Sequence, residues 1–295
     1  MSLRVLVIGK TGQLARELAL RAPNDLAVTA IGRPELDLAN PTNAAAFVRD
    51  FPCDAVINAS AYTAVDKAES ELDAAMLLNA EAPGAIAAAC AARDIPFVHV
   101  STDYVFDGEK SAPYVETDAT EPQGAYGRSK LTGETFVLTA GERAAIIRTS
   151  WVYASHGANF LRTMLRLAET RDELGVVADQ FGRPTWAADL ADVCLAVTRE
   201  LAARNANAQG VFHYAGAGDA TWADFAEAIF AASAQRGGPS ARVRRITTAE
   251  YPTPAKRPAN SRLDTTKIEA LGVTPRPWRE AVALCMDEIA AQRGS

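Results

Sequence analysis

The stretch RVLVIGKTGQLA, residues 4–15, decides the fold. An apolar run of strand length ends at Gly9, and the residues after Gly12 open a helical pattern. A glycine turn between a strand and a helix lets backbone N–H groups approach a pyrophosphate, and the helix N-terminus adds positive potential. Gly9 and Gly12 therefore predict a dinucleotide-binding turn. The spacing is GxxGxxA, with Ala15 in place of the usual third glycine, and taken alone it also fits an ordinary strand-to-helix turn.

Apolar runs and helical patterns alternate through the first half of the chain, which strengthens this prediction. The runs are rich in Val and Ile and almost continuously apolar, as in strands that are buried on both faces. Such alternation predicts an α/β fold: a doubly wound parallel sheet of the Rossmann type with helices on both faces. The predicted strands are 5–8, 27–31, 55–58, 97–101 and 145–148, and the predicted helices are 12–22, 41–51, 71–93 and 127–140.

The second half of the chain, after Arg148, has a different pattern, in which loops rich in Pro, Gly and Trp separate short strands from helices. It predicts a smaller α/β substrate-binding region in the C-terminal part of the chain. The predicted division is a dinucleotide-binding domain at 1–150, to which the chain returns around 186–215, and a substrate-binding region at 151–185 and 216–295. Further helices are predicted at 159–170, 186–203, 221–235 and 276–292, and short strands at 174–178, 211–215 and 243–247.

Composition restricts the expected partners and compartment. The 295 residues carry a net charge of −6 without a block of lysines and arginines, so no nucleic acid polymer is expected as a partner. Four scattered cysteines without a CxxC pair indicate reduced thiols in a cytoplasmic protein. Three dispersed histidines give no support for a metal site, and none is predicted. The N-terminus has no signal-peptide pattern, and no apolar run is expected to reach the length of a bilayer span, so no membrane partner is expected.

The end of the second predicted strand bears on the choice of cofactor. An acidic residue there binds the ribose 2′-hydroxyl of NAD, whereas an arginine accommodates the 2′-phosphate of NADP. The sequence at 31–35 reads IGRPE, and Arg33 is the better-placed side chain. NADPH is therefore the predicted cofactor, and NADH, with Glu35 on the ribose, stays the alternative. Asp37 and Leu38 follow, at a position where the chain can border the adenine ring of the cofactor.

A reductase-type site is indicated where the fourth predicted strand ends at Thr102, because strand carboxyl ends face the ligand crevice. Tyr126 and Lys130 lie four residues apart where QGAYGRSK, residues 123–130, enters a helix, so they share one helix face. Reduction of a ketone requires a hydride and a proton. Tyr126 can give the proton, and the Lys130 ammonium is expected to lower the phenol pKa. Thr102 can hydrogen-bond the same oxygen and orient it.

Several motifs together resemble those of the extended short-chain dehydrogenase/reductases. They are GKTGQLA, NASAYTAVDKAE, STDYVFDG, YGRSK, RTSWVY, DQFGRPT and RPANSRLDTTK, from Gly9 to about Lys267. Within that group the sequence resembles the dTDP-4-dehydrorhamnose reductases. The resemblance implies that the 4-keto group of dTDP-4-dehydro-L-rhamnose is reduced to dTDP-L-rhamnose with NADPH or NADH, for polysaccharide biosynthesis.

The resemblance also implies roles for particular residues. Tyr126 is the implied proton donor, Lys130 its partner and Thr102 the third catalytic hydroxyl. Besides Gly9, the implied cofactor contacts are Gly12, Gln13, Leu14, Arg33, Asp37, Leu38, Ala61, Tyr62, Thr63 and Lys130. The implied substrate contacts are Thr102, Asp103, Tyr126, Trp151, Asn159, Arg257 and Ser261. Arg257 can neutralise a diphosphate, and Trp151 can cover a sugar face or a base.

One departure from the family concerns a metal-bridged dimer that some members form through acidic residues. Glu17 matches one of those positions, but Ala188 stands at another. A structural Mg²⁺ is therefore not expected, and a homodimer is left open.

Two other functions fit the same fold. A nucleotide-sugar dehydratase or epimerase is the first, but the adjacent acid pair expected of a dehydratase is absent, since Tyr104 follows Thr102 and Asp103. A non-catalytic NADP-binding regulatory subunit is the second, because a fold does not fix a function. Reduction of a nucleotide sugar is the preferred interpretation.

Overall fold

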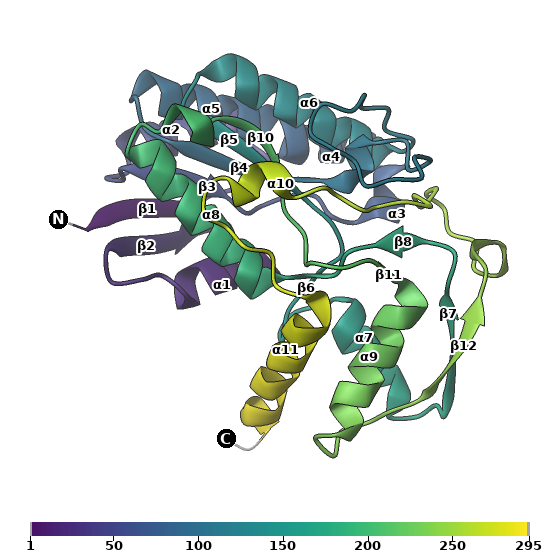
Figure 1. The fold of residues 1–295 in the computed structure, drawn as a ribbon. Helices are drawn as coiled ribbons and strands as arrows, with labels where there is room; N and C mark the ends of the chain where they lie inside the picture. The colour runs from purple at the N-terminus through teal and green to yellow at the C-terminus, as the bar shows by residue number, and fades with distance from the viewer. Residues whose placement is uncertain (1, 294–295) are drawn as a thin grey trace.

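The computed structural model describes residues 2–293, and a six-stranded sheet lies at its centre (Figure 1). Its strands are β1 (Leu3–Ile8), β2 (Leu26–Ile31), β3 (Ala55–Asn58), β4 (Phe97–Thr102), β5 (Ala144–Thr149) and β10 (Gly210–His213). They are parallel and have the order β10-β5-β4-β3-β1-β2. Because β2 and β3 lie on opposite sides of β1, the winding reverses there. A ligand crevice forms at such a reversal, outside the carboxyl ends of the strands.

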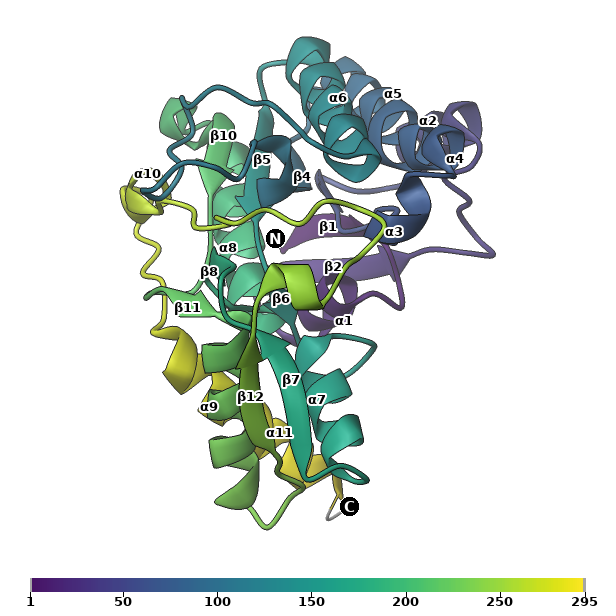
Figure 2. The same cartoon turned by 90° about the vertical axis from the view of Figure 1, so that its right-hand side faces the viewer.

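Helices cover both faces of this sheet (Figures 1 and 2). One face carries α1 (Gln13–Leu20) and α8 (Ala187–Ala202), and the other carries α2 (Pro41–Asp50), α5 (Ala82–Ala92) and α6 (Ala125–Ala140). The side chains of β1 alternate accordingly. Val5 and Val7 belong to the core under α1 and α8, whereas Leu6 and Ile8 belong to the core on the opposite face. The predicted doubly wound α/β fold is confirmed.

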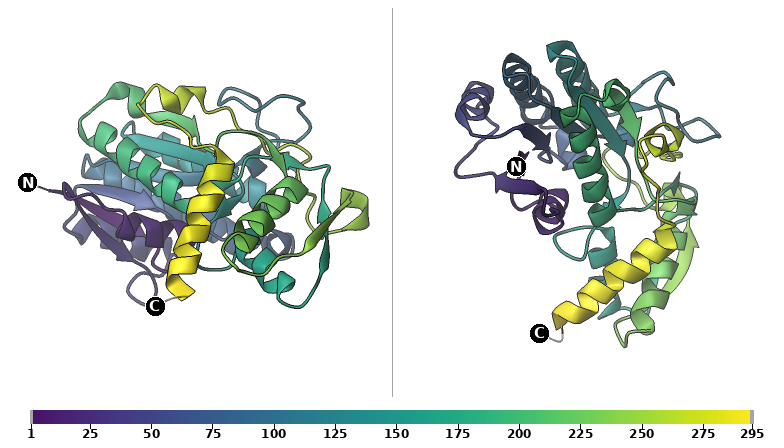
Figure 3. Two further views of the ribbon diagram at one scale, coloured as in Figure 1. Left: turned by 60° about the horizontal axis from the view of Figure 1, so that its bottom comes forward. Right: turned by 60° about the vertical axis from the view of Figure 1, so that its left-hand side comes forward.

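A smaller α/β region lies beyond one end of the sheet (Figures 1 and 3). Its helices are α7 (Phe160–Ala168), α9 (Trp222–Ala234) and α11 (Trp278–Arg293), and its longer strands are β7 (Glu173–Val177) and β12 (Arg242–Ile246), which pair in parallel. It has a core of its own, in which Leu161, Phe225 and Trp278 are buried. Its role in substrate binding, and the domain boundaries, stay predictions.

Short elements complete the described structure. The two-residue strands are β6 (Val152–Tyr153), β8 (Phe181–Gly182), β9 (Thr185–Trp186) and β11 (Ala220–Thr221), and they pair as β6 with β9 and β8 with β11. The short helices are α3 (Val65–Ala68) and α10 (Thr266–Glu269), with 3₁₀ turns at Asp103–Val105, Ala206–Ala208 and Thr248–Glu250.

The helix predicted at 71–93 consists of three parts. It runs from α4 (Leu72–Met76) through a π-helical turn, η1 (Leu77–Glu81), into α5, which has Pro83 in its first turn. Over Leu72–Ala92 this run is long and apolar enough to cross a membrane, by length and composition. The expectation that no run reaches that length is therefore wrong, because many alanines make the helix apolar. Half of its most apolar 18 residues are buried inside the fold, where the helix contacts α2 and α6, as a core helix does.

Helix α6 approaches its neighbours too closely for a side chain at two of its positions. A Cβ atom on Gly133 would lie 2.0 Å from the carbonyl oxygen of Asn79 in η1, and one on Gly127 would lie 2.1 Å from the carbonyl oxygen of Tyr104. Without these Cβ atoms, α6 packs directly against backbone. The inner face of the helix thereby carries Tyr126 and Lys130 to the end of β4.

Substitution of Gly133 tests this close approach. Gly133→Ala is expected to lower the free energy of unfolding by about 3 kcal/mol, the upper part of the range for overpacked cores, although alanine is the better helix former. Thr135→Ala, at an exposed position of the same helix, is the control and should change stability by less than about 0.5 kcal/mol. Urea denaturation measures both values. Equal stabilities of Gly133→Ala and the wild-type protein would contradict the packing described.

Candidate active site

A cleft of about 880 Å³ lies at the carboxyl ends of the central strands. Its walls come from the turns after β1, β2, β3 and β4, from α6, and from residues 149–152 and 157–158. The predicted site residues that line it are Gly9, Gly12, Gln13, Leu14, Arg33, Asp37, Leu38, Ala61, Thr63, Thr102, Asp103, Tyr126, Lys130 and Trp151. The other four predicted residues lie outside the lining: Tyr62, Asn159, Arg257 and Ser261.

The turn after β1 leaves backbone donors open to the cleft. Gly9 has a φ of 123°, a conformation that favours glycine, and its amide N–H donates to the carbonyl of Ile31. Gly12 precedes α1 as its N-cap, and no side chain caps the helix there. A Cβ atom on Gly12 would meet nothing within 4 Å. The first N–H groups of α1 and the free space beside Gly12 therefore fit a pyrophosphate.

Arg33 and Glu35, which follow β2, differ in whether their charges are already paired. Arg33 is exposed, lines the cleft, and has neither an ion-pair nor a hydrogen-bond partner among residues 2–293. Glu35 accepts a hydrogen bond from Lys10 Nζ at 2.9 Å, and this contact lowers the pKa of Glu35. Because Glu35 is engaged and Arg33 is free, the cleft favours a 2′-phosphate at this position.

The loop after β3 places only part of its predicted contacts in the cleft. Ala61 and Thr63 line the wall, but the Tyr62 hydroxyl donates to Glu71 at 2.6 Å, outside it. The backbone of Tyr62 is held by the Asn79 side chain, with hydrogen bonds of 2.8 and 3.1 Å. Tyr62 therefore positions the loop through its backbone rather than offering its side chain to the cleft.

Thr102 and Asp103 lie together where β4 ends. The Thr102 hydroxyl donates to Asp103 Oδ1 at 3.1 Å. Burial raises the pKa of Asp103 to about 6, although the nearby hydroxyls of Ser261 and Thr102 lower it. Asp103 Oδ2 is buried and has no hydrogen-bond partner in the described part of the chain. This oxygen can accept a hydrogen bond from a hydroxyl group of a ligand in the cleft.

Tyr126 is half-buried at the cleft, with its ring edge-on to Tyr104 at 5.5 Å between centroids. Burial raises the pKa of its hydroxyl above the ordinary value, the charge of Asp103 raises it further, and a hydrogen bond with Thr102 lowers it. The expectation that Lys130 lowers this pKa is not met, because Lys130 is directed elsewhere. The phenol keeps its proton at neutral pH, as a proton donor must.

Lys130 is 1% exposed, and its Nζ contacts the wall behind the cleft. It donates to the carbonyl of Val100 at 2.7 Å and lies 3.2 Å from His99 Nε2. Burial lowers the pKa of Lys130 to about 8, and the charge of Glu134 raises it. Glu134 lies one turn further along α6 and forms a buried ion pair with Arg148, at 2.6 Å.

Trp151 and Asn159 have different relations to the cleft. Trp151 lines it and stacks on Trp222, with ring centroids 3.6 Å apart, so the indole is held as a flat apolar wall. The Asn159 side chain caps α7, donates to Gln13 Oε1 at 2.9 Å and donates to two backbone carbonyls. Asn159 is therefore already engaged, and it connects α7 to α1.

Arg257 and Ser261 approach the cleft from the C-terminal part of the chain. Ser261 contacts Asp103, as described above. Arg257 Nη2 donates to Asp66 Oδ2 at 2.7 Å, whereas its Nη1 is buried without a hydrogen-bond partner in the described structure. Burial raises the pKa of Tyr104 to about 12, although Arg257 beside it lowers that pKa. The guanidinium thus lies next to a cleft-lining tyrosine, with a free donor for an anion.

The residues at the family's metal position do not fit a bridging Mg²⁺. Glu17 is 3% exposed and is hydrogen-bonded to His156 Nε2 at 2.8 Å, and Ala188 is buried. Within residues 2–293, no group of three or more His, Cys, Asp or Glu side chains is arranged to hold a metal ion.

Sequence reasoning did not identify three residues that shape the site. Asn79 in η1 holds the Tyr62 loop and donates to Ser129 of α6 at 2.9 Å. Tyr104 lines the cleft, and His99 lies behind it. The available signal for His99 is a single polar residue within the apolar strand FVHVST.

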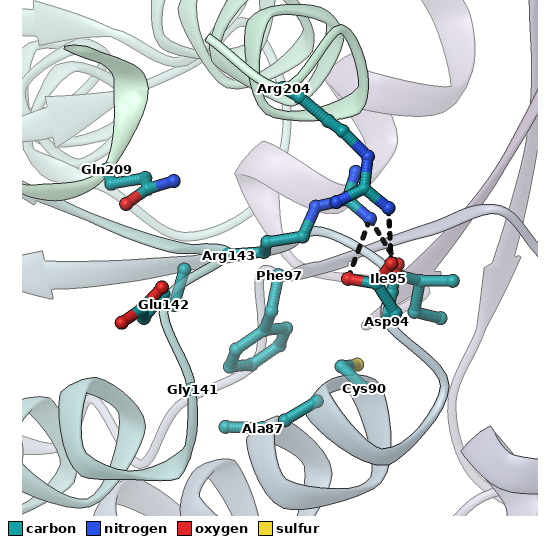
Figure 4. Close-up of a pocket in the computed structure, with 12 residues that line it drawn as sticks. Ala87, Cys90, Asp94, Ile95, Phe97, Gly141, Glu142, Arg143, Arg204 and Gln209 are labelled. Carbon is teal, nitrogen blue, oxygen red and sulfur yellow. Dashed lines mark hydrogen bonds and ion pairs between the residues drawn. The ribbon is translucent and has the colours of Figure 1, made fainter. Parts of the chain in front are cut away.

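A second cavity, of about 400 Å³, lies at the amino ends of β4 and β5 (Figure 4). Arg143 and Arg204 both contact the carboxylate of Asp94 there, so the charges of these two arginines are already paired (Figure 4). Burial raises the pKa of the nearby Cys90 thiol, which keeps it unreactive. The cleft at the carboxyl ends is therefore the candidate active site.

The fold and the cleft together define a Rossmann-type dinucleotide-binding protein with a threonine, a tyrosine and a lysine at the crevice. This combination is the one expected of a reductase.

Comparison with known proteins places the chain more closely. It matches the family described as RmlD substrate binding domain over residues 3–291. It is 46% identical to a dTDP-4-dehydrorhamnose reductase of Sinorhizobium fredii over 281 residues, 95% of each chain. It is 41% identical to a probable dTDP-4,6-dihydroxy-2-methyloxan-3-one 4-ketoreductase of Streptomyces antibioticus over 292 residues, 98% of this chain and 96% of the relative.

A solved structure agrees with these matches. The fold superposes with a TM-score of 0.91 on a dTDP-4-dehydrorhamnose reductase of Bacillus anthracis in complex with NADP, at 32% identity and covering 98% of this chain and 100% of the other. The chain belongs to the RmlD substrate binding domain family, and the family predicted from the sequence is confirmed.

The raised pKa of Asp103 generates a stability prediction. In the folded protein this pKa is about 6, above the ordinary value of 3.8, so the folded state binds the proton more tightly. The contribution of Asp103 to stability therefore falls as the pH rises from about 4 to about 6. Asp103→Asn cannot ionise and is expected to be more stable than the wild-type protein at pH 7, by up to about 3 kcal/mol, and to lose this advantage near pH 4.

Urea denaturation at both pH values measures the difference. Asp50→Asn, at an exposed position of α2, is the control and should show no gain that depends on pH. An Asp103→Asn protein that is less stable than wild type at pH 7 would mean that the folded state stabilises the carboxylate.

Proposed function

We propose that the protein reduces the 4-keto group of dTDP-4-dehydro-L-rhamnose to dTDP-L-rhamnose with NADPH, and that Tyr126 supplies the proton. The observation that carries this proposal is that Tyr126 and Thr102 share one cleft with an open helix N-terminus and with Arg33, which has no partner among the described residues. The names of the Sinorhizobium fredii and Bacillus anthracis proteins support the substrate, and the NADP bound to the latter supports the cofactor.

The residues of the chain divide the chemistry among them. The bound nicotinamide supplies the hydride. Tyr126 holds the proton that the developing alkoxide needs, and Thr102 orients the phenol. Asp103 Oδ2, which has no partner in the described structure, accepts a hydrogen bond from a sugar hydroxyl.

Other residues hold the ends of the two ligands. Arg33 binds the 2′-phosphate of the cofactor, and the N-terminus of α1 binds its pyrophosphate. Arg257 Nη1, which has no hydrogen-bond partner in the described part of the chain, offers a charged donor to the diphosphate of the sugar nucleotide. The Trp151 indole covers an apolar face of the ligand.

The sugar is the least constrained part of the proposal. The Streptomyces antibioticus relative is named for a different 4-keto dTDP sugar, so 4-keto reduction is shared while the sugar differs. Purified protein should oxidise NADPH in the presence of dTDP-4-dehydro-L-rhamnose and form dTDP-L-rhamnose. If NADPH is oxidised only with another 4-keto dTDP sugar, that sugar is the substrate instead. If the protein binds NADPH tightly but oxidises it with none of the 4-keto dTDP sugars, the proposal of a reductase fails and a regulatory subunit takes its place.

Removal of the phenolic hydroxyl tests the proton donor. Tyr126→Phe is expected to lower kcat by about 10²–10⁴-fold, because a positioned general acid contributes this much, while NADPH still binds. NADPH oxidation and fluorescence titration measure the two quantities. Tyr251→Phe, at an exposed tyrosine outside the cleft lining, is the control and should keep full activity. Full activity of Tyr126→Phe would exclude Tyr126 as the donor.

Removal of the free guanidinium tests cofactor choice. Arg33→Ala is expected to raise the Kd for NADPH by about 10–100-fold, because hydrogen bonds to charged groups are worth about 1.5–3 kcal/mol, and to leave the Kd for NADH nearly unchanged. Arg49→Ala, at an exposed position of α2 outside the cleft lining, controls for the loss of charge. Equal losses of affinity for the two nucleotides would show that Arg33 does not bind the 2′-phosphate.

A further inference from the structure

Three buried side chains form a hydrogen-bonded chain behind the cleft. Asn58 ends β3, His99 is its register partner on β4, and Lys130 comes from α6. Each is at most 1% exposed. Asn58 Nδ2 lies 3.1 Å from His99 Nδ1, and His99 Nε2 lies 3.2 Å from Lys130 Nζ. The proton positions along this chain follow from the groups at its ends.

The first end fixes the tautomer of His99. The backbone N–H of Ser60 donates to Asn58 Oδ1 at 3.1 Å, so the Asn58 oxygen faces Ser60 and the NH₂ group faces His99. An NH₂ group can only donate, so His99 Nδ1 must accept. Burial and the nearby Lys130 lower the pKa of His99 well below its ordinary value, so the ring is neutral and has one N–H. That hydrogen is then on Nε2.

At the other end of the hydrogen-bonded chain, the His99 N–H faces Lys130 Nζ. An ammonium group has only donors, so an ammonium at Lys130 would oppose the His99 N–H across 3.2 Å. A neutral amine has one lone pair, which can accept from His99 while an N–H of the amine donates to the Val100 carbonyl at 2.7 Å. The amine therefore satisfies both contacts, and the ammonium satisfies one.

The charged groups around Lys130 do not reverse this preference. Glu134 lies on the same helix and favours the ammonium. Its carboxylate is bound by Arg148 through three hydrogen bonds of 2.6 to 3.2 Å, and this opposite charge offsets much of its effect on Lys130. The net direction agrees with the geometry, since the pKa of Lys130 is lowered to about 8, chiefly by burial.

We propose that His99 is a positioning residue for the reduction: Asn58 holds it as the Nε2–H tautomer, and its N–H disfavours the ammonium form of Lys130. This inference rests on the proposed function, in which Lys130 is the partner of Tyr126. A destabilised ammonium gives up its proton more readily. Lys130 can therefore supply, through an intervening water, the proton that restores the Tyr126 phenol after it has donated its own, since the Lys130 Nζ is directed to β4 and not to the phenol. The amine left on Lys130 accepts the His99 N–H until water returns its proton.

Nitrogen NMR of the histidines tests the tautomer directly, in the purified protein without added nucleotide. The chain has three histidines, so the spectrum of His99→Gln assigns the signals of His99. The expected result is a neutral ring with its hydrogen on Nε2 between pH 6 and 9, roughly the range in which a histidine and a shifted lysine titrate. A hydrogen on Nδ1, or an imidazolium, would overturn the proposal.

A second variant reverses the tautomer. In Asn58→Asp the new carboxylate can accept from both Ser60 and His99, so the ring hydrogen is expected to move to Nδ1 and Nε2 to accept from the Lys130 ammonium. The basic limb of the kcat/KM profile for the sugar is then expected to move up by about one pH unit or more. Asn43→Asp, at an exposed position of α2, adds the same charge elsewhere and should leave the profile unchanged.

The outcomes separate this proposal from the proposed function. A shifted profile without a change of tautomer would overturn it, because charge alone would then act. If Asn58→Asp does not fold, the tautomer in the wild-type protein decides the question. If the protein does not reduce the sugar, the proposed function fails, and the tautomer still decides whether the His99 Nε2–H faces Lys130.

Discussion

The close contact between α6 and the backbone of its neighbours is the constraint on which the site depends. Two glycines of that helix, Gly127 and Gly133, meet carbonyl oxygens where no Cβ atom fits. The helix therefore lies near enough to the sheet for side chains spaced by four residues to reach it. Tyr126 reaches the cleft, Lys130 reaches the backbone of β4, and the next residue in the series forms a buried ion pair with β5. The packing of α6 against this backbone thus sets both the position and the burial of the helix face that carries Tyr126 and Lys130.

Burial then determines the electrostatics of the site. It raises the pKa of acids such as Asp103 and Tyr126, and it lowers the pKa of Lys130. Two buried carboxylates of the site differ in their partners. Glu134 is paired with an arginine, whereas one oxygen of Asp103 has no partner in the described structure. Asp103 lines the cleft, so a ligand bound there can satisfy the unpartnered oxygen. The site is thus costly to fold and suited to binding hydroxyl groups, as functional sites commonly are.

Much of this arrangement could be predicted from the sequence, because it depends on periodicity. Continuous apolar runs separated by helical patterns specify a doubly wound sheet, and a spacing of four places Tyr126 and Lys130 on one face. The rest depends on contacts that no local pattern contains. Asn159 was expected at the substrate, but its amide is engaged with Gln13. The direction of the Tyr126 pKa shift depends on burial and on where the Lys130 amine points, and neither can be read from the spacing. His99 was missed because one polar residue in a strand usually has only a structural role.

We expect the Tyr126 hydroxyl to face the reacting oxygen of a sugar nucleotide bound in the cleft. A crystal structure with NADP⁺ and dTDP-L-rhamnose bound tests it most directly. The Tyr126 hydroxyl is expected to lie within hydrogen-bond distance of the sugar O4, with the nicotinamide C4 over the sugar C4 and the 2′-phosphate at Arg33. A sugar bound with O4 directed away from Tyr126, toward another proton donor, would contradict it.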